Sequence, residues 1–396
     1  MAKNKIVIVG GGFGGVKAAL MLAKDDRFAV QLVSDKANFR YYPSLYHTAT
    51  GGTARNSSIP LKEILPENVE LIEKTVVSLD KKGKLVLTDD GQKLPYDSLI
   101  LALGVVTNYF GIQGLSDYSY GIKSSEEVER LKAHLHKQIQ DEHKPDLNYV
   151  IVGAGPTGIE LAGSLPDYLR HIMKLHGVAH KPLHVDLIEA APRLLPRMPR
   201  DTSRAVAKQL KKLGIKLFLG QTVQGETADE LTVNGKPVRS HTVIWTAGVS
   251  NHPFFKENNF TINIRGKVMT DVYLQAEDNI YVIGDNANTP YSGLAQTALY
   301  DGVFVAHNLR RQLSGKTPRS YRPKRPITVI PAGHRWAAVN YGQFRLYGWI
   351  GWMLREAADL IAFHDYEPWW KAGKQWLTEF ETQDSCPVCA AASQSE

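Results

Sequence analysis

Short apolar runs alternate with glycine turns and helical patterns through the first part of the chain. Residues 5–9 are β-branched and show no polar alternation, which is typical of a parallel strand buried on both faces. An Ala- and Leu-rich stretch over residues 16–24 predicts a helix, and residues 29–33 predict the next strand. This order predicts a strand–helix–strand unit whose first turn is rich in glycine.

The same order returns in the middle of the chain. Residues 149–152 predict a buried strand, a helix begins near residue 159, and residues 184–188 predict the strand that follows. Later strands are predicted at residues 216–219, 231–233 and 242–244. The repeated unit predicts an α/β fold with two Rossmann-like dinucleotide-binding domains.

The segments around these units predict the remaining elements. Hairpin strands are expected over residues 69–79 and 85–88, on either side of a Lys-Lys-Gly turn. Residues 96–104 predict a buried strand that ends in glycine, and residues 108–115 a linker. Residues 124–143 predict a polar helix that begins with a capping signal.

We expect the second domain to be inserted in the first, followed by a separate C-terminal region. The predicted boundaries are 1–115 with 256–330 for the first domain, 116–255 for the second, 331–385 for a C-terminal interface or membrane-surface region, and 386–396 for a flexible tail.

Composition narrows the class of protein. The chain of 396 residues has 43% hydrophobic and 22% charged residues, as an ordinary globular protein does. The net charge of +7 is spread without a basic stripe interleaved with aromatics, so we expect no nucleic-acid partner. A net positive charge favours the binding of an anionic cofactor or of an anionic membrane surface. With no signal segment, no apolar run of roughly 18 residues and only two cysteines, we expect a cytoplasmic setting and no disulfide framework.

The first glycine-rich turn has the spacing Gly-x-Gly-x-x-Gly between a strand and a helix. Gly10 allows the tight turn, Gly12 lets backbone N–H groups approach a pyrophosphate, and Gly15 allows close packing of helix and strand. The helix N-terminus then faces the phosphate charge. The predicted cofactor contacts in this turn are Gly10, Gly12, Phe13, Gly14 and Gly15.

A second turn of the same spacing follows the strand at 149–152. Two complete units in one chain are far more specific than either alone, and they predict two dinucleotides brought face to face. One would be held permanently and one would exchange, with a hydride passing between their rings. The predicted contacts in this turn are Gly153, Gly155, Pro156, Thr157 and Gly158.

An acid stands at the end of the second strand of each unit, where a ribose is held. Asp35 is about 20 residues beyond Gly15 and is either a ribose ligand or a solvated loop acid. Glu189 ends the corresponding strand of the second unit and favours a ribose with free hydroxyls over a 2′-phosphate. Arg193 is close enough to leave use of the phosphorylated nucleotide open.

Other candidates lie at strand ends later in the chain. Gly104 closes one buried strand, and Ala247 with Gly248 closes its counterpart in the second unit. Asp285 ends the buried strand at 280–285, where it would accept hydrogen bonds from the sugar-alcohol chain of a flavin; the alternative is a turn cap. The helix expected over residues 295–309 would point its N-terminus at the flavin ring.

The aromatic segment 39–52 has two interpretations. It could cover one side of a flat ring system, with Thr48 contacting the flavin cofactor, or it could pack on the core. His47 within it has no partner at a metal-ligand spacing, so we expect no metal site.

Together these landmarks resemble the two-dinucleotide-binding flavoprotein superfamily, and within it the type II NADH dehydrogenases, single-subunit NADH:quinone oxidoreductases. The resemblance covers most of residues 5–310 and is carried by six blocks: IVIVGGGFGG, PSLYHTAT, VGAGPTGIELAG, IEAAPRLLP, IWTAGV and VIGD. It implies an FAD domain, an NAD domain and the transfer of a hydride from NADH to flavin, followed by two electrons to a membrane quinone.

The resemblance also implies roles for single residues. Gly10, Gly12 and Gly15 would hold the FAD pyrophosphate, and the second glycine set that of NADH. Glu160 resembles the glutamate beside the nicotinamide, and Glu189 would hold the adenosine ribose. Ala295 and Gln296 resemble the Ala-Gln pair at the flavin and quinone site, so Glu160 and Gln296 are the catalytic candidates. The implied enzyme is a peripheral protein on the cytoplasmic face of the cell membrane, and we expect a homodimer.

Two departures from the family pattern bear on the electron acceptor. Tyr300 and Asp301 stand where the family motif continues with Gln and then Gln or Glu. Residues 40–52 contain no cysteine, which excludes disulfide reduction by a dithiol near the flavin. The alternatives are a soluble NAD(P)H-dependent reductase that uses oxygen or a small redox protein, and a flavin-bound redox sensor with negligible turnover.

From residue 341 onward the composition shifts to Trp and Tyr mixed with Lys and Arg. Such a pattern is typical of an interfacial helix, with rings at the headgroup level and cations outside. The alternatives are an aromatic dimer interface and ordinary packing. Cys386 and Cys389 form one Cys-x-x-Cys pair, too few ligands for a zinc site, in a tail expected to be disordered with reduced thiols.

Overall fold

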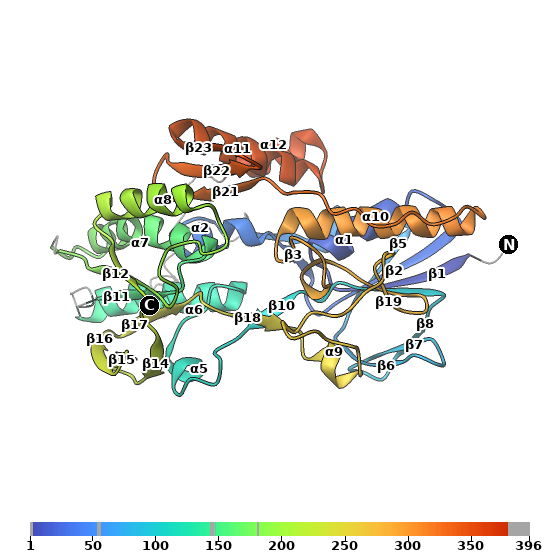
Figure 1. Ribbon diagram of the computed structural model, residues 1–396, viewed down its shortest axis with the longest axis horizontal. Helices are drawn as coiled ribbons and strands as arrows, with labels where there is room; N and C mark the ends of the chain where they lie inside the picture. The colour runs from blue at the N-terminus through green and yellow to red at the C-terminus, as the bar shows by residue number, and fades with distance from the viewer. Residues whose placement is uncertain (1–2, 54–56, 143–145, 147, 180–181, 379–396) are drawn as a thin grey trace, which may run out of the picture. The chain divides into compact units, whose positions relative to one another are not determined.

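The computed structural model describes residues 3–53, 57–142, 146, 148–179 and 182–378. The chain divides into two compact units (Figure 1). Unit 1 contains residues 1–40, 58–106 and 249–326, and unit 2 contains residues 41–57, 107–248 and 327–396. Residues 41–52 of the aromatic segment and residues 327–378 therefore group with the second dinucleotide unit. The predicted tail at 386–396, with both cysteines, lies outside the described residues.

Unit 1 is built on a six-stranded sheet with the strand order β19-β20-β9-β1-β2-β5. The strands β1, β2, β5, β9 and β20 run parallel, and β19 pairs antiparallel at the edge. Four consecutive residues of β1, Ile6 to Val9, are buried, as the unbroken apolar run predicts. The strand bounds are β1 Asn4–Val9, β2 Phe28–Ser34, β5 Val69–Glu73, β9 Ser98–Leu101, β19 Gln275–Glu277 and β20 Ile280–Val282.

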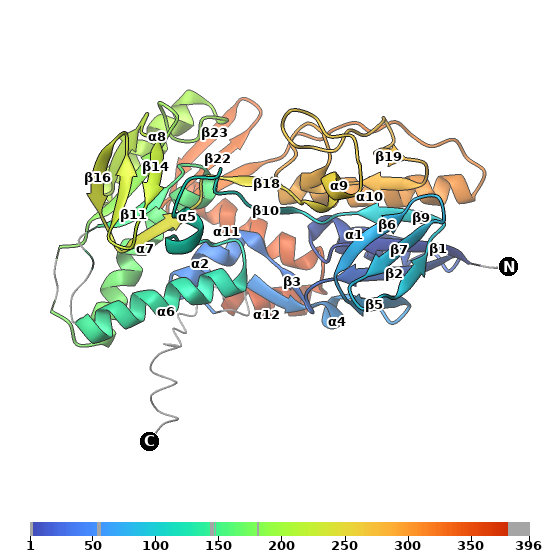
Figure 2. The ribbon, with the colours of Figure 1, turned by 90° about the horizontal axis from the view of Figure 1, so that it is seen from below.

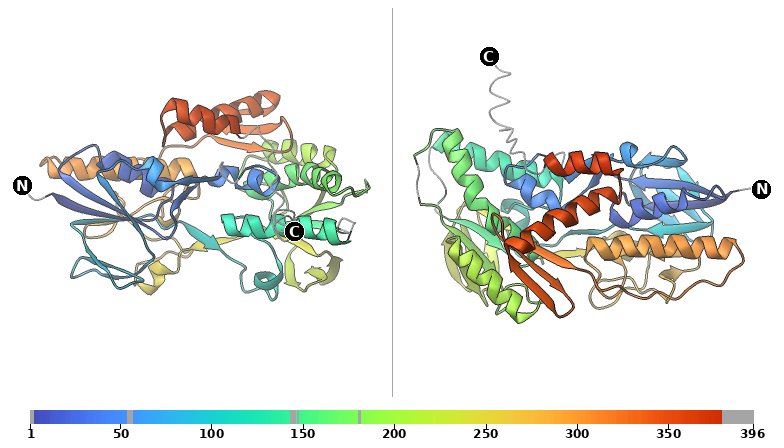
Figure 3. Two further views of the ribbon diagram at one scale, coloured as in Figure 1. Left: turned by 180° about the vertical axis from the view of Figure 1, so that it is seen from behind. Right: turned by 90° about the horizontal axis from the view of Figure 1, so that it is seen from above.

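The helices α1 (Phe13–Leu22) and α10 (Ala295–Leu313) pack against each other in unit 1 (Figure 3, right). Their backbones come very close, since a Cβ added at Gly302 would lie 2.5 Å from the Gly14 carbonyl oxygen. Unit 1 also holds the smaller elements β3 (Asn38–Arg40), β4 (Ser58–Pro60), α4 (Leu61–Ile64), β6 (Val76–Asp80), β7 (Leu85–Thr88), β8 (Lys93–Pro95) and α9 (Phe254–Glu257).

One predicted strand is divided in the structure. Residues 69–79 form β5 and β6, separated at Lys74 and Thr75. β5 joins the parallel sheet, whereas β6 pairs antiparallel with β7 in a separate three-stranded sheet, so only the second half is a hairpin strand. The apolar pattern continues through the division because both halves are partly buried, and for that reason it did not reveal the break.

Unit 2 is built on a four-stranded parallel sheet with the strand order β13-β12-β11-β17. The long helix α7 (Pro156–Leu175) follows β11, with Pro156 in its first turn, where the ring costs no hydrogen bond. The strand bounds are β11 Tyr149–Val152, β12 Val185–Glu189, β13 Lys216–Leu219 and β17 Thr242–Trp245, and a separate antiparallel sheet holds β14 Val223–Glu226, β15 Glu230–Val233 and β16 Lys236–Arg239.

The capping signal before α6 (Ser125–Glu142) forms the bonds that it predicts. The N–H of Glu127 donates to Ser124 Oγ at 3.1 Å, and the N–H of Ser124 donates to the Glu127 carboxylate at 3.2 Å. The helix then runs without interruption (Figure 2). The short helices η1 (Tyr42–Ser44) and α2 (Leu45–Ala49) come from the aromatic segment, and α2 packs on α6 and α7.

The C-terminal residues of unit 2 form an antiparallel sheet followed by two helices. The helix α11 packs on this sheet and on α12. Among the described residues, no helix combines the length and the apolar character needed to cross a membrane. The remaining bounds are β10 Val105–Thr107, α5 Leu115–Tyr118, α8 Arg200–Lys212, β18 Val249–Asn251, β21 Thr328–Pro331, β22 Ala337–Tyr341, β23 Phe344–Gly348, α11 Trp349–His364 and α12 Trp369–Thr378.

Candidate functional site

The glycine turn of unit 1 has the geometry of a phosphate cradle. Gly10 has φ +114°, and a Cβ there would lie 2.2 Å from the Ala102 carbonyl oxygen. A Cβ on Gly15 would lie 2.0 Å from the Gly10 carbonyl oxygen. The helix can therefore pack this closely against the turn only because Gly15 has no side chain. Gly12, in contrast, faces open space, with no atom within 4 Å of its added Cβ. That open face at the start of α1 fits the pyrophosphate of a dinucleotide.

Unit 2 has the same arrangement of three glycines at the start of α7. Gly153 has φ +106°, and its added Cβ would lie 2.6 Å from the Ala247 Cα. An added Cβ on Gly158 would lie 1.9 Å from the Gly153 carbonyl oxygen, whereas Gly155 faces open space as the N-cap of α7. Neither α1 nor α7 has a side chain that caps its first turn, so each helix start presents the positive end of its dipole to an anion.

The acid at the end of β12 is held by the second cradle. The Glu189 carboxylate accepts hydrogen bonds from the N–H of Ala154 at 2.7 Å and from the N–H of Ala191 at 2.8 Å. This places a negative charge beside the cradle, where an adenosine ribose would lie. The Arg193 guanidinium is engaged with the loop after it, donating to the carbonyls of Leu195 and Met198 and to Ser203 Oγ.

The counterpart acid in unit 1, Asp35, is exposed just beyond β2. The hydroxyl of Thr48 donates to the Ser44 carbonyl at 3.1 Å and lies 3.0 Å from Ser57 Oγ, so it belongs to the hydrogen bonds of its own segment. Thr48 lies in unit 2, whereas the cradle of its predicted cofactor lies in unit 1. Both FAD assignments stay predictions.

The end of β20 carries a set of polar contacts that includes two residues sequence reasoning missed. Asp285 accepts a hydrogen bond from the N–H of Gly293 at 3.1 Å. Fully buried Asn286 accepts from the N–H of Gly104 at 2.9 Å and donates to the Gly104 carbonyl at 2.6 Å. Fully buried Asp301 accepts from the Gly284 N–H at 3.0 Å and from the Tyr321 hydroxyl at 2.6 Å, and burial raises its pKa to about 6.

These contacts fix the turn that carries Asp285 against the end of β9 in unit 1. The signal for Asn286 was its place next to the Gly-Asp pair, and the signal for Asp301 was its departure from the family motif. Ala295 and Gln296 form the first turn of α10 in the same unit, and Gln296 is exposed there. Glu160, the other catalytic candidate, lies in unit 2.

Glu160 lies in the first turns of α7, two residues after the last cradle glycine. Burial raises the pKa of its carboxyl to about 8, and the charge of Asp359 raises it as well, while Arg355 and Lys123 act in the opposite direction. Its side chain has no hydrogen-bond partner among the described residues. A carboxyl with such a pKa exchanges a proton near neutral pH, which suits a group that handles protons in catalysis.

The charges that act on Glu160 belong to a buried pair on α11. Arg355 forms an ion pair with Asp359 one turn later and donates to the Pro43 carbonyl at 3.2 Å. Asp359 also accepts from the Tyr41 hydroxyl at 2.7 Å, and the Tyr41 ring lies 4.7 Å from that of Phe363. These contacts fasten the aromatic segment to α11, which sequence reasoning did not anticipate because the partners are more than 300 residues apart.

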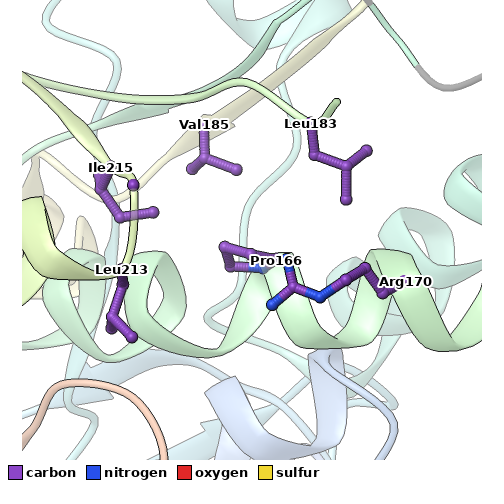
Figure 4. Close-up of a pocket in the computed structure, with 7 residues that line it drawn as sticks. Pro166, Arg170, Leu183, Val185, Leu213 and Ile215 are labelled. Carbon is purple, nitrogen blue, oxygen red and sulfur yellow. The ribbon is translucent and has the colours of Figure 1, made fainter. Parts of the chain in front are cut away.

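One small surface hollow lies apart from both cradles. It has a volume of about 70 Å³ and is lined by Pro166, Arg170, Leu183, Val185, Leu213, Gly214 and Ile215 (Figure 4). None of these residues is a candidate for cofactor binding. Among the described residues, no group of three or more His, Cys, Asp or Glu side chains is placed to hold a metal ion.

The chain belongs to the pyridine nucleotide-disulphide oxidoreductase family, which it matches over residues 4–302. The type II NADH:quinone oxidoreductase Ndh of Mycobacterium tuberculosis is 27% identical over 395 residues, covering 91% of this chain and 85% of that protein. Similar proteins with the name type II NADH:quinone oxidoreductase occur in Staphylococcus species, for example S. haemolyticus at 26% identity.

Solved structures show the same fold. NDH2 from Plasmodium falciparum, in complex with NADH, superposes with a TM-score of 0.81 at 17% identity and covers 96% of this chain and 97% of that one. The sulfide:quinone oxidoreductase of Aquifex aeolicus reaches a TM-score of 0.78 at 20% identity, with 94% of this chain and 92% of that one covered. The predicted resemblance and the fold with two dinucleotide-binding domains are therefore confirmed.

Proposed function

We propose that this protein is an FAD-dependent NADH dehydrogenase that passes a hydride from NADH to flavin and then two electrons to a quinone. The observation that carries the proposal is the pair of matching glycine cradles, one in each unit, each at the N-terminus of a helix that follows a parallel strand. The predicted enzyme class and the cofactors FAD and NAD(H) agree with the family and with the names of its relatives.

The cradle of unit 1 fits FAD, because Gly12 leaves room for a pyrophosphate where a side chain would fill it. Asp285 and the turn around it would hold the sugar-alcohol chain. The cradle of unit 2 would hold NADH, with Glu189 on the ribose and Ala247 and Gly248 near the nicotinamide end. When bound, FAD supplies the hydride acceptor and the two-electron carrier. Glu160 would hold or release a proton at its carboxyl, and Gln296 would orient the quinone.

We propose that α11 and α12 attach the enzyme to a membrane, and that the quinone acceptor reaches the enzyme from this membrane. The exposed side chains of α11 recur on one face at Trp349, Ile350, Met353, Leu354 and Ile361, opposite the buried Gly351, Asp359 and Phe363. Trp349 is 58% exposed, and Trp370 of α12 is 71% exposed. Large exposed rings on an amphipathic helix suit the headgroup level of a bilayer. From the resemblance to the type II NADH dehydrogenases we place the enzyme on the cytoplasmic face of the membrane, and we expect a homodimer.

A soluble reductase that uses oxygen remains the second candidate function. The observation that favours it concerns Tyr300 and Asp301 of α10, which stand where the family motif continues with Gln and then Gln or Glu. There Asp301 is buried against Gly284 and Tyr321, and the Tyr300 ring lies 5.7 Å from the ring of Tyr321 and beneath the Lys324 ammonium at 4.6 Å. A site that differs here from quinone-reducing relatives could use another acceptor.

Stopped-flow absorbance under anaerobic conditions tests both candidates. We expect NADH to bleach the flavin rapidly and a short-chain quinone to restore its colour in a second rapid phase. Reoxidation that is fast with oxygen but slow with every quinone would favour the soluble reductase. A flavin that NADH does not bleach would exclude both and favour a sensor.

Glu160 predicts a pH dependence of turnover. With a folded pKa of about 8 against about 4.5 in the unfolded chain, the folded carboxyl keeps its proton over that interval while the unfolded one loses it. This group therefore makes the fold less stable as pH rises from about 4.5 to 8. We expect quinone turnover to show an ionisation near pH 8 that Glu160→Gln abolishes, with a rate roughly 100-fold lower. The measurement is kcat against pH, and an unchanged profile in the variant would contradict the role.

Glu189 predicts a preference for NADH. A 2′-phosphate at this ribose would meet the carboxylate, and Arg193 is engaged with its own loop. We expect Glu189→Gln to narrow the ratio of kcat/KM for NADH to that for NADPH by about tenfold, since a like-charge contact is removed. Arg193→Gln is the control: it should lower stability and leave the ratio unchanged. A larger effect of Arg193→Gln on the ratio would overturn the assignment.

A further inference from the structure

The formal net charge of the molecule resides in one short segment. Residues 310–326 contain seven Lys and Arg and no Asp or Glu. Of the 47 basic residues, the remaining 40 are balanced by 40 acidic ones, so the charge of +7 belongs to this segment. Basic residues occur along the whole chain, but within this segment no acidic residue balances them.

Most of this charge lies on an extended stretch after α10, which we name the basic strap and define as residues 315–326. Its exposed cations are Lys316, Arg319, Arg322, Lys324 and Arg325. Among the described residues none of the five forms an ion pair; the ammonium of Lys324 lies over the Tyr300 ring at 4.6 Å. An unbalanced row of cations of this kind attracts anions strongly at low ionic strength.

The basic strap is held along α10 in unit 1 by hydrogen bonds. The Asn308 side chain donates to the Arg319 carbonyl at 2.8 Å and accepts from the Arg319 N–H at 2.9 Å. The Tyr321 hydroxyl donates to the buried Asp301, and the Tyr321 N–H donates to the Val272 carbonyl at 2.7 Å. Prolines at 318, 323 and 326 stiffen the backbone between these points. The cations are therefore presented in a fixed array at little cost in conformational entropy.

We propose that the basic strap is a docking surface for the anionic lipid headgroups of a membrane. The segment leads directly into residues 327–378, whose helices carry the exposed Trp, Ile and Leu side chains of α11 and α12. Apolar side chains supply insertion into the bilayer, and clustered cations supply selection for anionic lipid. The proposal rests on the proposed function, because that function brings the enzyme to a membrane. An acidic protein is the other partner of suitable charge.

The test uses the FAD-loaded enzyme and sedimentation with vesicles of phosphatidylcholine, with or without about one-third phosphatidylglycerol. The strap variant is Lys316→Gln, Arg322→Gln, Lys324→Gln and Arg325→Gln, which spares Arg319 and the anchors Asn308, Asp301 and Tyr321. The control removes the same charge from four exposed lysines elsewhere: Lys82→Gln, Lys93→Gln, Lys236→Gln and Lys256→Gln. Each basic residue near an anionic surface contributes about fivefold in binding, so we expect the strap variant, which removes four of them, to lose roughly 600-fold on anionic vesicles in about 0.1 M salt.

The strap variant should bind neutral vesicles as the wild type does, and the control should keep most of its preference for anionic vesicles. Equal losses in the two variants would mean that only total charge matters and would overturn the proposal. So would a wild type that ignores phosphatidylglycerol, or one that binds soluble polyglutamate through the basic strap in preference to vesicles. Arg322→Gln with Arg325→Gln should give an intermediate loss, which guards against misfolding of the larger variant. NADH oxidation with a water-soluble quinone, measured on the variant Arg322→Gln with Arg325→Gln, reports the proposed function separately, because this variant keeps Lys324 over the Tyr300 ring.

Discussion

Gly12→Ala is expected to yield a folded protein that has lost its flavin. The residue has φ −91° and ψ −169°, which alanine adopts without strain, and its added Cβ meets no atom within 4 Å. The protein alone therefore gives the methyl group room, and the melting temperature of the flavin-free form should not change. The same methyl group occupies the face from which a pyrophosphate approaches the start of α1. Overpacking of this kind costs about 1–3 kcal/mol, so we expect FAD affinity to fall roughly 100-fold.

The measurement is the ratio of flavin absorbance to protein, followed by titration of FAD into stripped enzyme. Gly373→Ala in α12 is the matched control, because it adds the same methyl group into equally open space away from both cradles. Gly15→Ala should behave differently from both: its Cβ would lie 2.0 Å from the Gly10 carbonyl, so the fold itself should be destabilised. A Gly12→Ala protein with the wild-type ratio of flavin to protein and the wild-type affinity for FAD would show that the cofactor does not bind at this turn.

The contrast between Gly12 and Gly15 shows what the sequence could predict. The spacing of the glycines, the buried strands before them and the helices after them are local patterns, and each of these elements is present in the structure. The capping box at Ser124 and Glu127 is also local, and its two bonds form as predicted. Contacts within a few residues along the chain leave a signature in the order of residue types, because their geometry follows directly from the backbone.

The surroundings of Glu160 could not be predicted in this way. Tyr41 and Asp359 are 318 residues apart, and nothing in either stretch identifies the other as its partner. Asp359 stands among apolar residues in the sequence, and in the structure it lies on the buried face of α11, one turn from Arg355. Similarly, the apolar pattern of residues 69–79 did not indicate that its two halves join different sheets. Tertiary contacts decide such cases, and a single sequence does not record them.

Asp359→Ala is expected to lower the free energy of unfolding by about 3–5 kcal/mol. The substitution leaves the Arg355 guanidinium buried without its carboxylate and removes the acceptor of the Tyr41 hydroxyl. Removing one partner of a buried ion pair costs far more than removing both, because the remaining charge has lost its compensation. The measurement is urea unfolding of the FAD-loaded enzyme, followed by tryptophan fluorescence.

The double variant Arg355→Met with Asp359→Leu separates charge from packing, because it replaces the pair by apolar side chains. We expect it to be several times less destabilised than Asp359→Ala. Equal destabilisation of the two would mean that the contacts of α11 with the aromatic segment, and not the uncompensated charge, set the cost.

The pH profile of turnover adds an independent measurement. Asp359 raises the pKa of Glu160, so its loss alone should move the ionisation of turnover from near pH 8 toward lower pH. Because stability and proton exchange at Glu160 depend on the same pair, α11 connects the proposed membrane face with the proposed NADH site inside unit 2.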